Sequence, residues 1–221
     1  LVDAVHSTYA AHKSKPLWGN SDINTLDMMH LANAMFPKAR FIHIVRDVRD
    51  VVLSNARMPY AVGNTLDVAR SWYLRVRTNL RMGAMIPGSR YVVVRYEDLL
   101  AAPETTVRAA CKQIGLGYDP RMLEYAREVD SKIPEERRWL WPKLGGALDA
   151  ANAGRWRREL GAIETELIRE QTADLLSELG YPVERECRTR SAVIGLETWY
   201  TIASGDRFRR LARNVRSLIG F

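Results

Sequence analysis

A five-residue apolar run followed at once by a charged turn is the feature that most constrains the fold of this chain. The run, Phe41–Val45, is rich in β-branched and aromatic residues and predicts a buried strand. A charged turn begins at Arg46, and Val48, Val51 and Val52 then recur at helical spacing. The stretch therefore predicts a strand, a turn and a helix, an order typical of a parallel α/β sheet.

Arg46 and Ser54 occupy positions in this stretch that suit an anion. Ligands of open α/β sheets bind beyond the carboxyl ends of the strands, near helix N-termini, and Arg46 lies at such an end. Ser54 lies two helical turns on, roughly 12 Å along the axis at about 1.5 Å per residue. A guanidinium fork and a hydroxyl can hold one phosphate. The alternatives are an arginine paired with Asp47 or Asp50, and a serine at a helix–sheet contact.

The rest of the chain extends the same pattern. A second strand is predicted at Tyr91–Arg95, after a helix from about Leu66 to Met85. Two short apolar strands separated by such a helix imply a parallel sheet with right-handed crossovers. Further helices are predicted after Ala102, after Asp119-Pro120, and from about Glu164 to Leu179. Residues 1–14 are weakly patterned, and residues 131–154 read as a long irregular segment.

Composition narrows the class of protein. The chain has 221 residues, enough for one α/β domain, and a net charge of +7. That charge suits anionic ligands, although an arginine-rich solvated surface explains it as well. Nucleic acid is not a predicted partner, because the sequence has no zinc-ligand spacing, basic region or aromatic RNA-binding signature. The sequence shows neither a signal peptide nor an apolar run near the roughly 20 residues of a membrane helix, which favours the cytoplasm.

Two residues of reactive type are expected to be structural. Cys111 lies on the apolar face of a predicted helix and reads as a buried thiol, and His43 reads as a hydrogen-bonded histidine of the core. The chain has 2 cysteines, which do not make a disulfide framework.

Four stretches together resemble the sulfotransferases that use 3′-phosphoadenosine 5′-phosphosulfate (PAPS). The Arg46-to-Ser54 spacing resembles the family's 3′-phosphate-binding segment. The other stretches resemble the family's strand-YED-helix segment, the loop with a basic residue and Trp near the nucleotide, and the Trp-Gly entry of the bacterial and tyrosylprotein branches; they are Arg95–Leu116, Asn152–Leu160 and Leu17–Asn20. The resemblance spans residues 15 to 182.

The resemblance implies a fold and an activity. The fold is α/β, a P-loop-kinase-like parallel sheet flanked by helices, with residues 1–182 as the sulfotransferase-like domain and 183–221 as a C-terminal extension. The activity is transfer of a sulfuryl group from PAPS to a hydroxyl or amine of a small-molecule, carbohydrate or peptide acceptor. The product nucleotide is 3′-phosphoadenosine 5′-phosphate (PAP), and no metal is required.

The resemblance also assigns site residues. Arg46 and Ser54 are expected on the 3′-phosphate, Tyr96 near the adenine, and Arg155 on the nucleotide. The alternative for Tyr96 is a core tyrosine at a strand end, and for Arg155 a solvated helix-end arginine. Asp22 is the candidate acid/base group, although it could instead cap the following helix.

Arg49 and Asp50 lie between the two phosphate-binding candidates in the charged turn. They are expected to form a structural pair with each other.

Two features depart from the family pattern. The Gly-containing loop that wraps the 5′-phosphosulfate finds no match in the sequence, and Ser21 stands where relatives carry a lysine. We therefore expect a fold incomplete at its N-terminus and an activity that needs a segment upstream of Leu1. The alternative is a relative that binds nucleotide or polyanion without turnover. A nucleotide kinase would need a Walker loop and a magnesium ligand, and neither is found.

The stretch from Asp206 to Phe221 places apolar residues on one helical face and five arginines on the rest. One interpretation is a terminal helix docked by its apolar face. The other is an interfacial helix that holds the protein near anionic lipid of a membrane surface or near an acidic acceptor.

Overall fold

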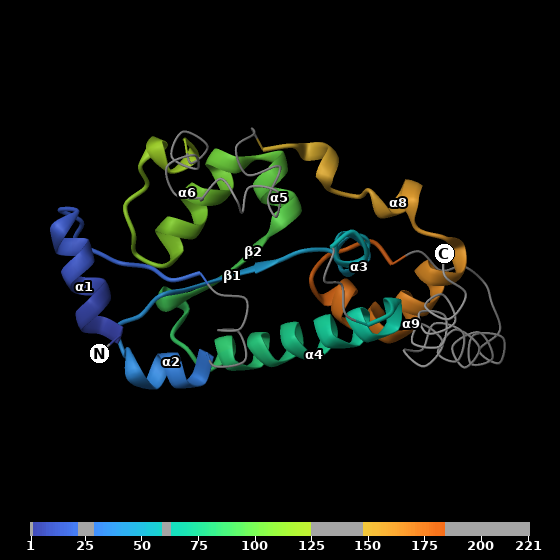
Figure 1. Cartoon of the computed structure of the whole chain (residues 1–221), viewed down its shortest axis with the longest axis horizontal. Helices are drawn as coiled ribbons and strands as arrows, with labels where there is room; N and C mark the ends of the chain where they lie inside the picture. The colour runs from blue at the N-terminus through green and yellow to red at the C-terminus, as the bar shows by residue number, and fades with distance from the viewer. Residues whose placement is uncertain (1, 22–28, 59–62, 125–147, 184–221) are drawn as a thin grey trace, which may run out of the picture. The chain divides into compact units, whose positions relative to one another are not determined.

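A computed structural model of the chain describes residues 2–21, 29–58, 63–124 and 148–183 (Figure 1). The chain divides into two units, Leu1–Pro37 and Lys38–Phe221, and each is described by itself. The described helices and strands are α1 (Val2–His12), α2 (Met29–Met35), β1 (Phe41–Val45), α3 (Val48–Ala56), α4 (Thr65–Ala84), β2 (Tyr91–Arg95), α5 (Tyr96–Ala101), α6 (Pro103–Gln113), α8 (Trp156–Glu159) and α9 (Ala162–Glu178). Asp22, most of the predicted irregular segment, and the stretch 206–221 lie outside the described residues.

In the first unit, Trp18 contacts α1 and Phe36, the residue that follows α2. The ring of Trp18 stacks on His6 at 4.6 Å between centroids and meets Phe36 edge-on at 5.6 Å. Its indole N–H also donates to Asp3 of α1 at 3.1 Å. Helix α1 was not predicted, because Ala10 is its one buried residue and its sequence carries no apolar stripe. Residues 1–14 therefore contain a helix despite their weak pattern, and its contacts with Trp18 stabilise it.

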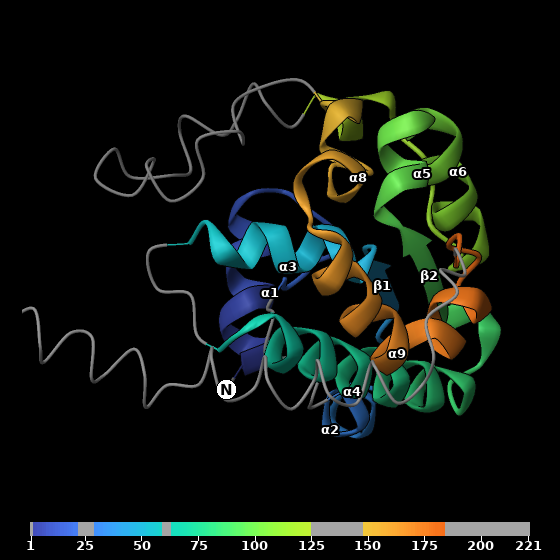
Figure 2. The ribbon, with the colours of Figure 1, turned by 90° about the vertical axis from the view of Figure 1, so that its right-hand side faces the viewer.

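The second unit contains a parallel pair of strands, which confirms the prediction. Phe41 is opposite Tyr91, and Val45 is opposite Arg95. Helices α4 and α9 lie on one side of the sheet and α5 and α6 on the other, as the two ribbon views show (Figures 1 and 2). On the α4 and α9 side, the buried core is formed by Val45, Val48, Val52, Ala69, Trp72, Val76, Ile168, Leu175, Leu176 and Tyr181.

The opposite face of the sheet is covered only in part by described residues. Val92 and Val94 of β2 pack against Ala110 and Ile114 at the α6 end. Cys111 is a buried free thiol, as predicted. Ile42 and Ile44 of β1, by contrast, are 53% and 55% exposed. The prediction that β1 is a buried strand is therefore right for one face and wrong for the other.

Two boundaries after β2 differ from the prediction. Helix α5 begins at Tyr96, directly after the strand, without the Gly or Pro that marks most such changes. The helix predicted after Asp119 is instead a short 3-10 turn, Pro120–Leu123, which Asp119 caps by accepting from the Arg121 backbone N–H at 2.9 Å. The start of the element was thus predicted, but its length was not.

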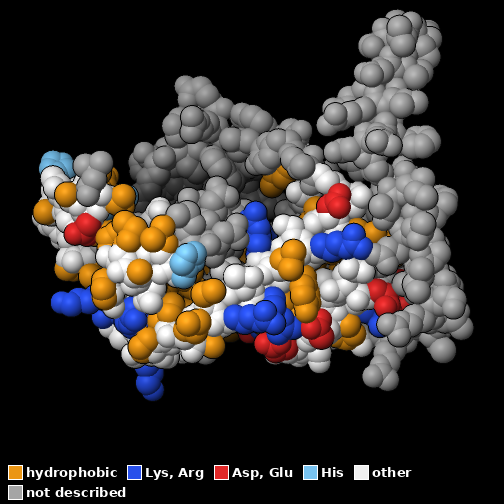
Figure 3. All heavy atoms as spheres, turned by 90° about the horizontal axis from the view of Figure 1, so that it is seen from below, with side chains coloured by type: hydrophobic (Ala, Val, Ile, Leu, Met, Phe, Trp, Pro, Cys, Tyr) orange, Lys and Arg blue, Asp and Glu red, His pale blue; other side chains and the backbone are white. Residues whose placement is uncertain are grey.

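Ion pairs connect α4 to α9 at the surface. Arg77 of α4 forms ion pairs with Asp174, at 2.7 Å, and with Glu178 of α9. Basic and acidic side chains lie beside one another on the face drawn in Figure 3. Part of the arginine content therefore belongs to a paired, solvated surface. Within the described part of the chain, no helix combines the length and apolar character needed to cross a membrane.

His43 joins both strands to α4 and is buried, as predicted. Its Nδ1 shares a hydrogen bond of 2.8 Å with the Tyr91 hydroxyl, which also donates to the Asn79 carbonyl at 3.3 Å. Burial lowers the pKa of His43 to about 4. In the unfolded chain its pKa is about 6.5, so the unfolded state takes up a proton between these two values while the folded state does not.

We expect the free energy of unfolding to fall as pH drops through this window. The contribution is complete above pH ~6.5 and is lost progressively down to pH ~4, by at most about 3 kcal/mol. Urea denaturation of wild type and His43→Gln at several pH values measures it, and the variant should show a flatter profile. His30→Gln removes an exposed histidine as a control and should keep the wild-type slope. Equal slopes in wild type and His43→Gln would contradict the assignment.

Candidate functional site

The turn between β1 and α3 is built on a buried ion pair. Asp47 is the N-cap of α3 and accepts from the Arg49 backbone N–H at 3.0 Å. The Arg49 guanidinium donates two further hydrogen bonds to the same carboxylate, from Nε at 2.9 Å and from Nη2 at 2.7 Å. The predicted pairing of Arg49 with Asp50 is therefore wrong. The capping carboxylate is the nearer partner, and Asp50 bonds to a distant loop instead.

Arg46 lies at the carboxyl end of β1 with its guanidinium against an aromatic ring. The group lies over the Tyr96 ring at 4.8 Å from the centroid, and its Nη2 donates to the Asn152 carbonyl at 2.9 Å. The backbone carbonyl of Arg46 accepts from the Trp72 indole at 3.1 Å. Its Nε is buried and has no hydrogen-bond partner among the described residues. The structure thus brings two of the predicted site residues, Arg46 and Tyr96, into contact.

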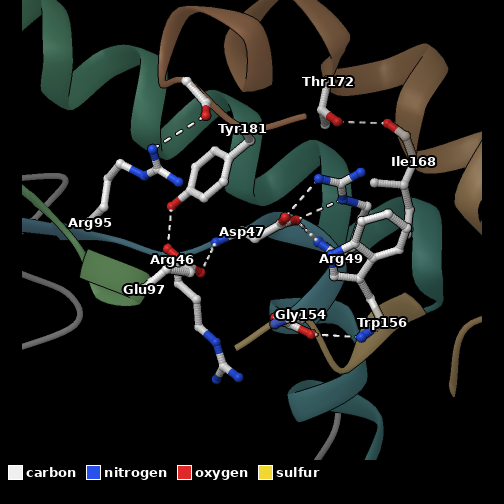
Figure 4. Close-up of polar contacts among 12 residues, drawn as sticks. Arg46, Asp47, Arg49, Arg95, Glu97, Gly154, Trp156, Ile168, Thr172 and Tyr181 are labelled. Carbon is white, nitrogen blue, oxygen red and sulfur yellow. Dashed lines mark hydrogen bonds and ion pairs between the residues drawn. The ribbon is translucent and has the colours of Figure 1, made fainter. Parts of the chain in front are cut away.

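Glu97, which follows Tyr96 in α5, holds the β1–α3 turn through hydrogen bonds. One of its oxygens accepts from the Asp47 backbone N–H at 3.0 Å and the other from the Tyr181 hydroxyl at 2.8 Å (Figure 4). Burial, together with the Glu97 carboxylate, raises the pKa of Tyr181 well above its ordinary value. Tyr181 therefore remains a protonated donor, and Glu97 links the β1–α3 turn to the segment after α9. This residue was not predicted as part of the site, although it lies inside the quoted YED stretch.

Ser54 lies in α3 and Arg155 is the N-cap residue of α8, and the carboxylate of Glu159 connects the two helices. Ser54 is half-buried in α3, and Arg57, three residues later, pairs with Glu159 of α8 at 2.6 Å. Arg155 also binds Glu159, through Nε at 3.1 Å and Nη2 at 3.0 Å. This pairing raises the pKa of Arg155 and lowers the pKa of Glu159. Arg155 is therefore a paired arginine next to α3 and not a freely solvated one. Asp22 lies outside the described residues.

A strand end, a helix N-terminus and several arginines meet at one loop, and this arrangement defines the class as an α/β protein. Comparison with known proteins gives the family. The sulfotransferase family model matches residues 2–120, more than half of the chain, so the chain belongs to the sulfotransferase family.

Named relatives agree with this. The omega-hydroxy-beta-dihydromenaquinone-9 sulfotransferase Stf3 of Mycobacterium bovis is 32% identical over 107 residues, covering 41% of this chain and 28% of the relative. Carbohydrate sulfotransferase 2 of Mus musculus is 29% identical over 122 residues, covering 55% and 22%. The chain therefore spans less than a third of the length of these two relatives.

A solved structure supports the fold. The sulfotransferase domain from the curacin biosynthetic pathway superposes with a TM-score of 0.53 at 15% identity, covering 83% of this chain and 69% of that one. The predicted fold, an α/β sulfotransferase fold, is confirmed.

Proposed function

We propose that this sulfotransferase uses PAPS as its donor and transfers the sulfuryl group to a hydroxyl or amine of a small-molecule, carbohydrate or peptide acceptor. Arg46 carries the proposal. It lies at the carboxyl end of a parallel strand and beside a helix N-terminus, where anions bind in folds of this kind.

The state of the Arg46 side chain supports a phosphate partner. Its Nε is buried without a partner in the described residues, and an unsatisfied buried N–H is costly. The Tyr96 ring packs against the planar face of the guanidinium and so fixes the direction in which its N–H groups point. A phosphate oxygen is an acceptor of the kind that this group lacks. The residues present therefore fit the 3′-phosphate of the nucleotide.

Each of the other predicted residues has a role in this proposal. The Ser54 hydroxyl donates a hydrogen bond to the same phosphate. Arg155 adds positive charge from the neighbouring loop, and Tyr96 borders the adenine. When bound, PAPS supplies the sulfuryl group, which bonds to the acceptor oxygen or nitrogen as its bond to the phosphate oxygen breaks and PAP leaves. Asp22 is proposed to take the acceptor proton. The protein otherwise acts by positioning and charge neutralisation.

The test is calorimetric titration of the chain with PAP and with adenosine 5′-monophosphate (AMP). The two ligands differ only in the 3′-phosphate. We expect PAP to bind at least about tenfold more tightly, because one charge-assisted hydrogen bond contributes roughly 1.5–3 kcal/mol. Equal affinity for both ligands would show that the chain has no 3′-phosphate site.

A further inference from the structure

Both oxygens of the buried Asp50 carboxylate accept hydrogen bonds from a loop more than a hundred residues away in the sequence. Asp50 lies in the first turn of α3 and is 1% exposed. Its Oδ2 accepts from the Gly154 backbone N–H at 2.7 Å, and its Oδ1 accepts from the Trp156 backbone N–H at 2.9 Å. The two amides flank Arg155. The carboxylate therefore fixes the backbone on both sides of that residue.

Both carboxylate oxygens of Asp50 have a backbone N–H donor, so both of its acceptors are used. Arg49 is not its partner, since that guanidinium binds Asp47. A buried carboxylate is costly unless its acceptors are used, so the loop and Asp50 depend on each other.

The loop that Asp50 holds is specific in shape. Gly154 has a φ of +69°, and a Cβ there would lie 2.8 Å from an Arg157 nitrogen. Trp156 is clamped as well, because the Arg49 guanidinium lies over its ring at 3.7 Å from the centroid (Figure 4). The loop thus approaches α3 in one defined conformation.

Two ends of this loop belong to the candidate site. The Asn152 carbonyl accepts from Arg46, and Arg155 lies between the two amides that Asp50 binds. We propose that Asp50 is a positioning residue of the nucleotide site, which holds the loop of Arg155 against the helix of Ser54. This inference rests on the proposed function, and it assigns the 3′-phosphate subsite to two segments joined by one carboxylate.

The main test replaces Asp50 with asparagine, which has one acceptor oxygen and so can satisfy only one of the two amides. We expect the Kd for PAP to rise about tenfold in Asp50→Asn and the Kd for AMP to stay unchanged. The loss should depend on Arg155: in an Arg155→Ala background, Asp50→Asn should weaken PAP by less than about twofold. A general loss of structure would weaken binding equally in both backgrounds.

Hydrogen exchange gives a readout without any ligand. The Gly154 and Trp156 amides should exchange at least about tenfold faster in Asp50→Asn, whereas the amides of β1 and β2 should not change. Asp119→Asn is the matched control, since Asp119 also accepts from a backbone N–H but at an exposed turn. It should alter neither exchange at the loop nor PAP binding.

A second variant keeps the test decisive if Asp50→Asn does not fold. Gly154→Ala disturbs the same clamp from the loop side and should produce the same selective loss of PAP binding. Unchanged loop exchange in both variants, or equal losses in the Arg155→Ala background, would overturn the positioning role. A wild type that does not prefer PAP over AMP would instead overturn the proposed function, and loop exchange would still decide whether Asp50 holds the loop.

Discussion

Arg46→Ala is expected to weaken PAP binding by about 3 kcal/mol, roughly 150-fold, and to leave AMP binding almost unchanged. The guanidinium is the cation at the end of β1, and alanine removes both its charge and its fork. The loss should be confined to ligands that carry the 3′-phosphate. Calorimetric titration of wild type and variant with both nucleotides measures the difference.

Two further variants separate charge, geometry and packing. Arg46→Lys keeps the charge but loses the planar fork over Tyr96, so an intermediate loss is expected. Arg90→Ala is the matched control, because Arg90 also donates to a backbone carbonyl, that of Ala39 at 3.1 Å, but at the start of β2. It should bind PAP as wild type does. Equal losses for PAP and AMP in Arg46→Ala would rule out the 3′-phosphate assignment and indicate a collapsed loop around Asn152.

The strands and long helices of the second unit could be predicted because their local patterns agree with their tertiary environment. β1 and β2 are short β-branched runs, and α4 carries an apolar stripe that packs into the core. Helix α9 ends at the stop signal Gly180-Tyr181-Pro182. Helix α1 has no such stripe, and its contacts with Trp18 come from a residue beyond its own end. Local pattern therefore contains nothing from which that helix could be inferred.

The residue types of the candidate site could be predicted from the sequence, but the hydrogen bonds between them could not. Arg46 was named from its place at a strand end and Tyr96 from the family resemblance. They lie in contact because parallel strands end at one edge. The partners of Asp50 and Glu97 were not predictable. A carboxylate in a charged turn has several arginines nearby in the sequence as possible partners. Its observed partners are the backbone amides of residues 154 and 156, and every residue type except proline has such an amide, so no residue type marks them.

Gly83→Ala is expected to destabilise the chain by about 2–4 kcal/mol, although alanine favours a helix over glycine by about 1 kcal/mol. A Cβ at Gly83 of α4 would lie 2.1 Å from Cζ and 2.2 Å from Cε1 of Tyr91. The ring must then move and lose its hydrogen bonds with His43 and the Asn79 carbonyl. Urea denaturation followed by circular dichroism measures the change, and Gly88→Ala, where a Cβ meets nothing within 4 Å, should have little effect.

A double-mutant cycle tests whether the tyrosine ring is the cause. Tyr91→Ala removes the atoms that the new Cβ would meet, at the cost of a cavity between the sheet and α4. In that background Gly83→Ala should be neutral or slightly stabilising, because only its gain in helix propensity remains. The coupling free energy between the two sites should then be about 2 kcal/mol or more. If Gly83→Ala instead costs the same in both backgrounds, α4 and the sheet approach each other at some other contact, and the close packing of Gly83 on Tyr91 is wrong.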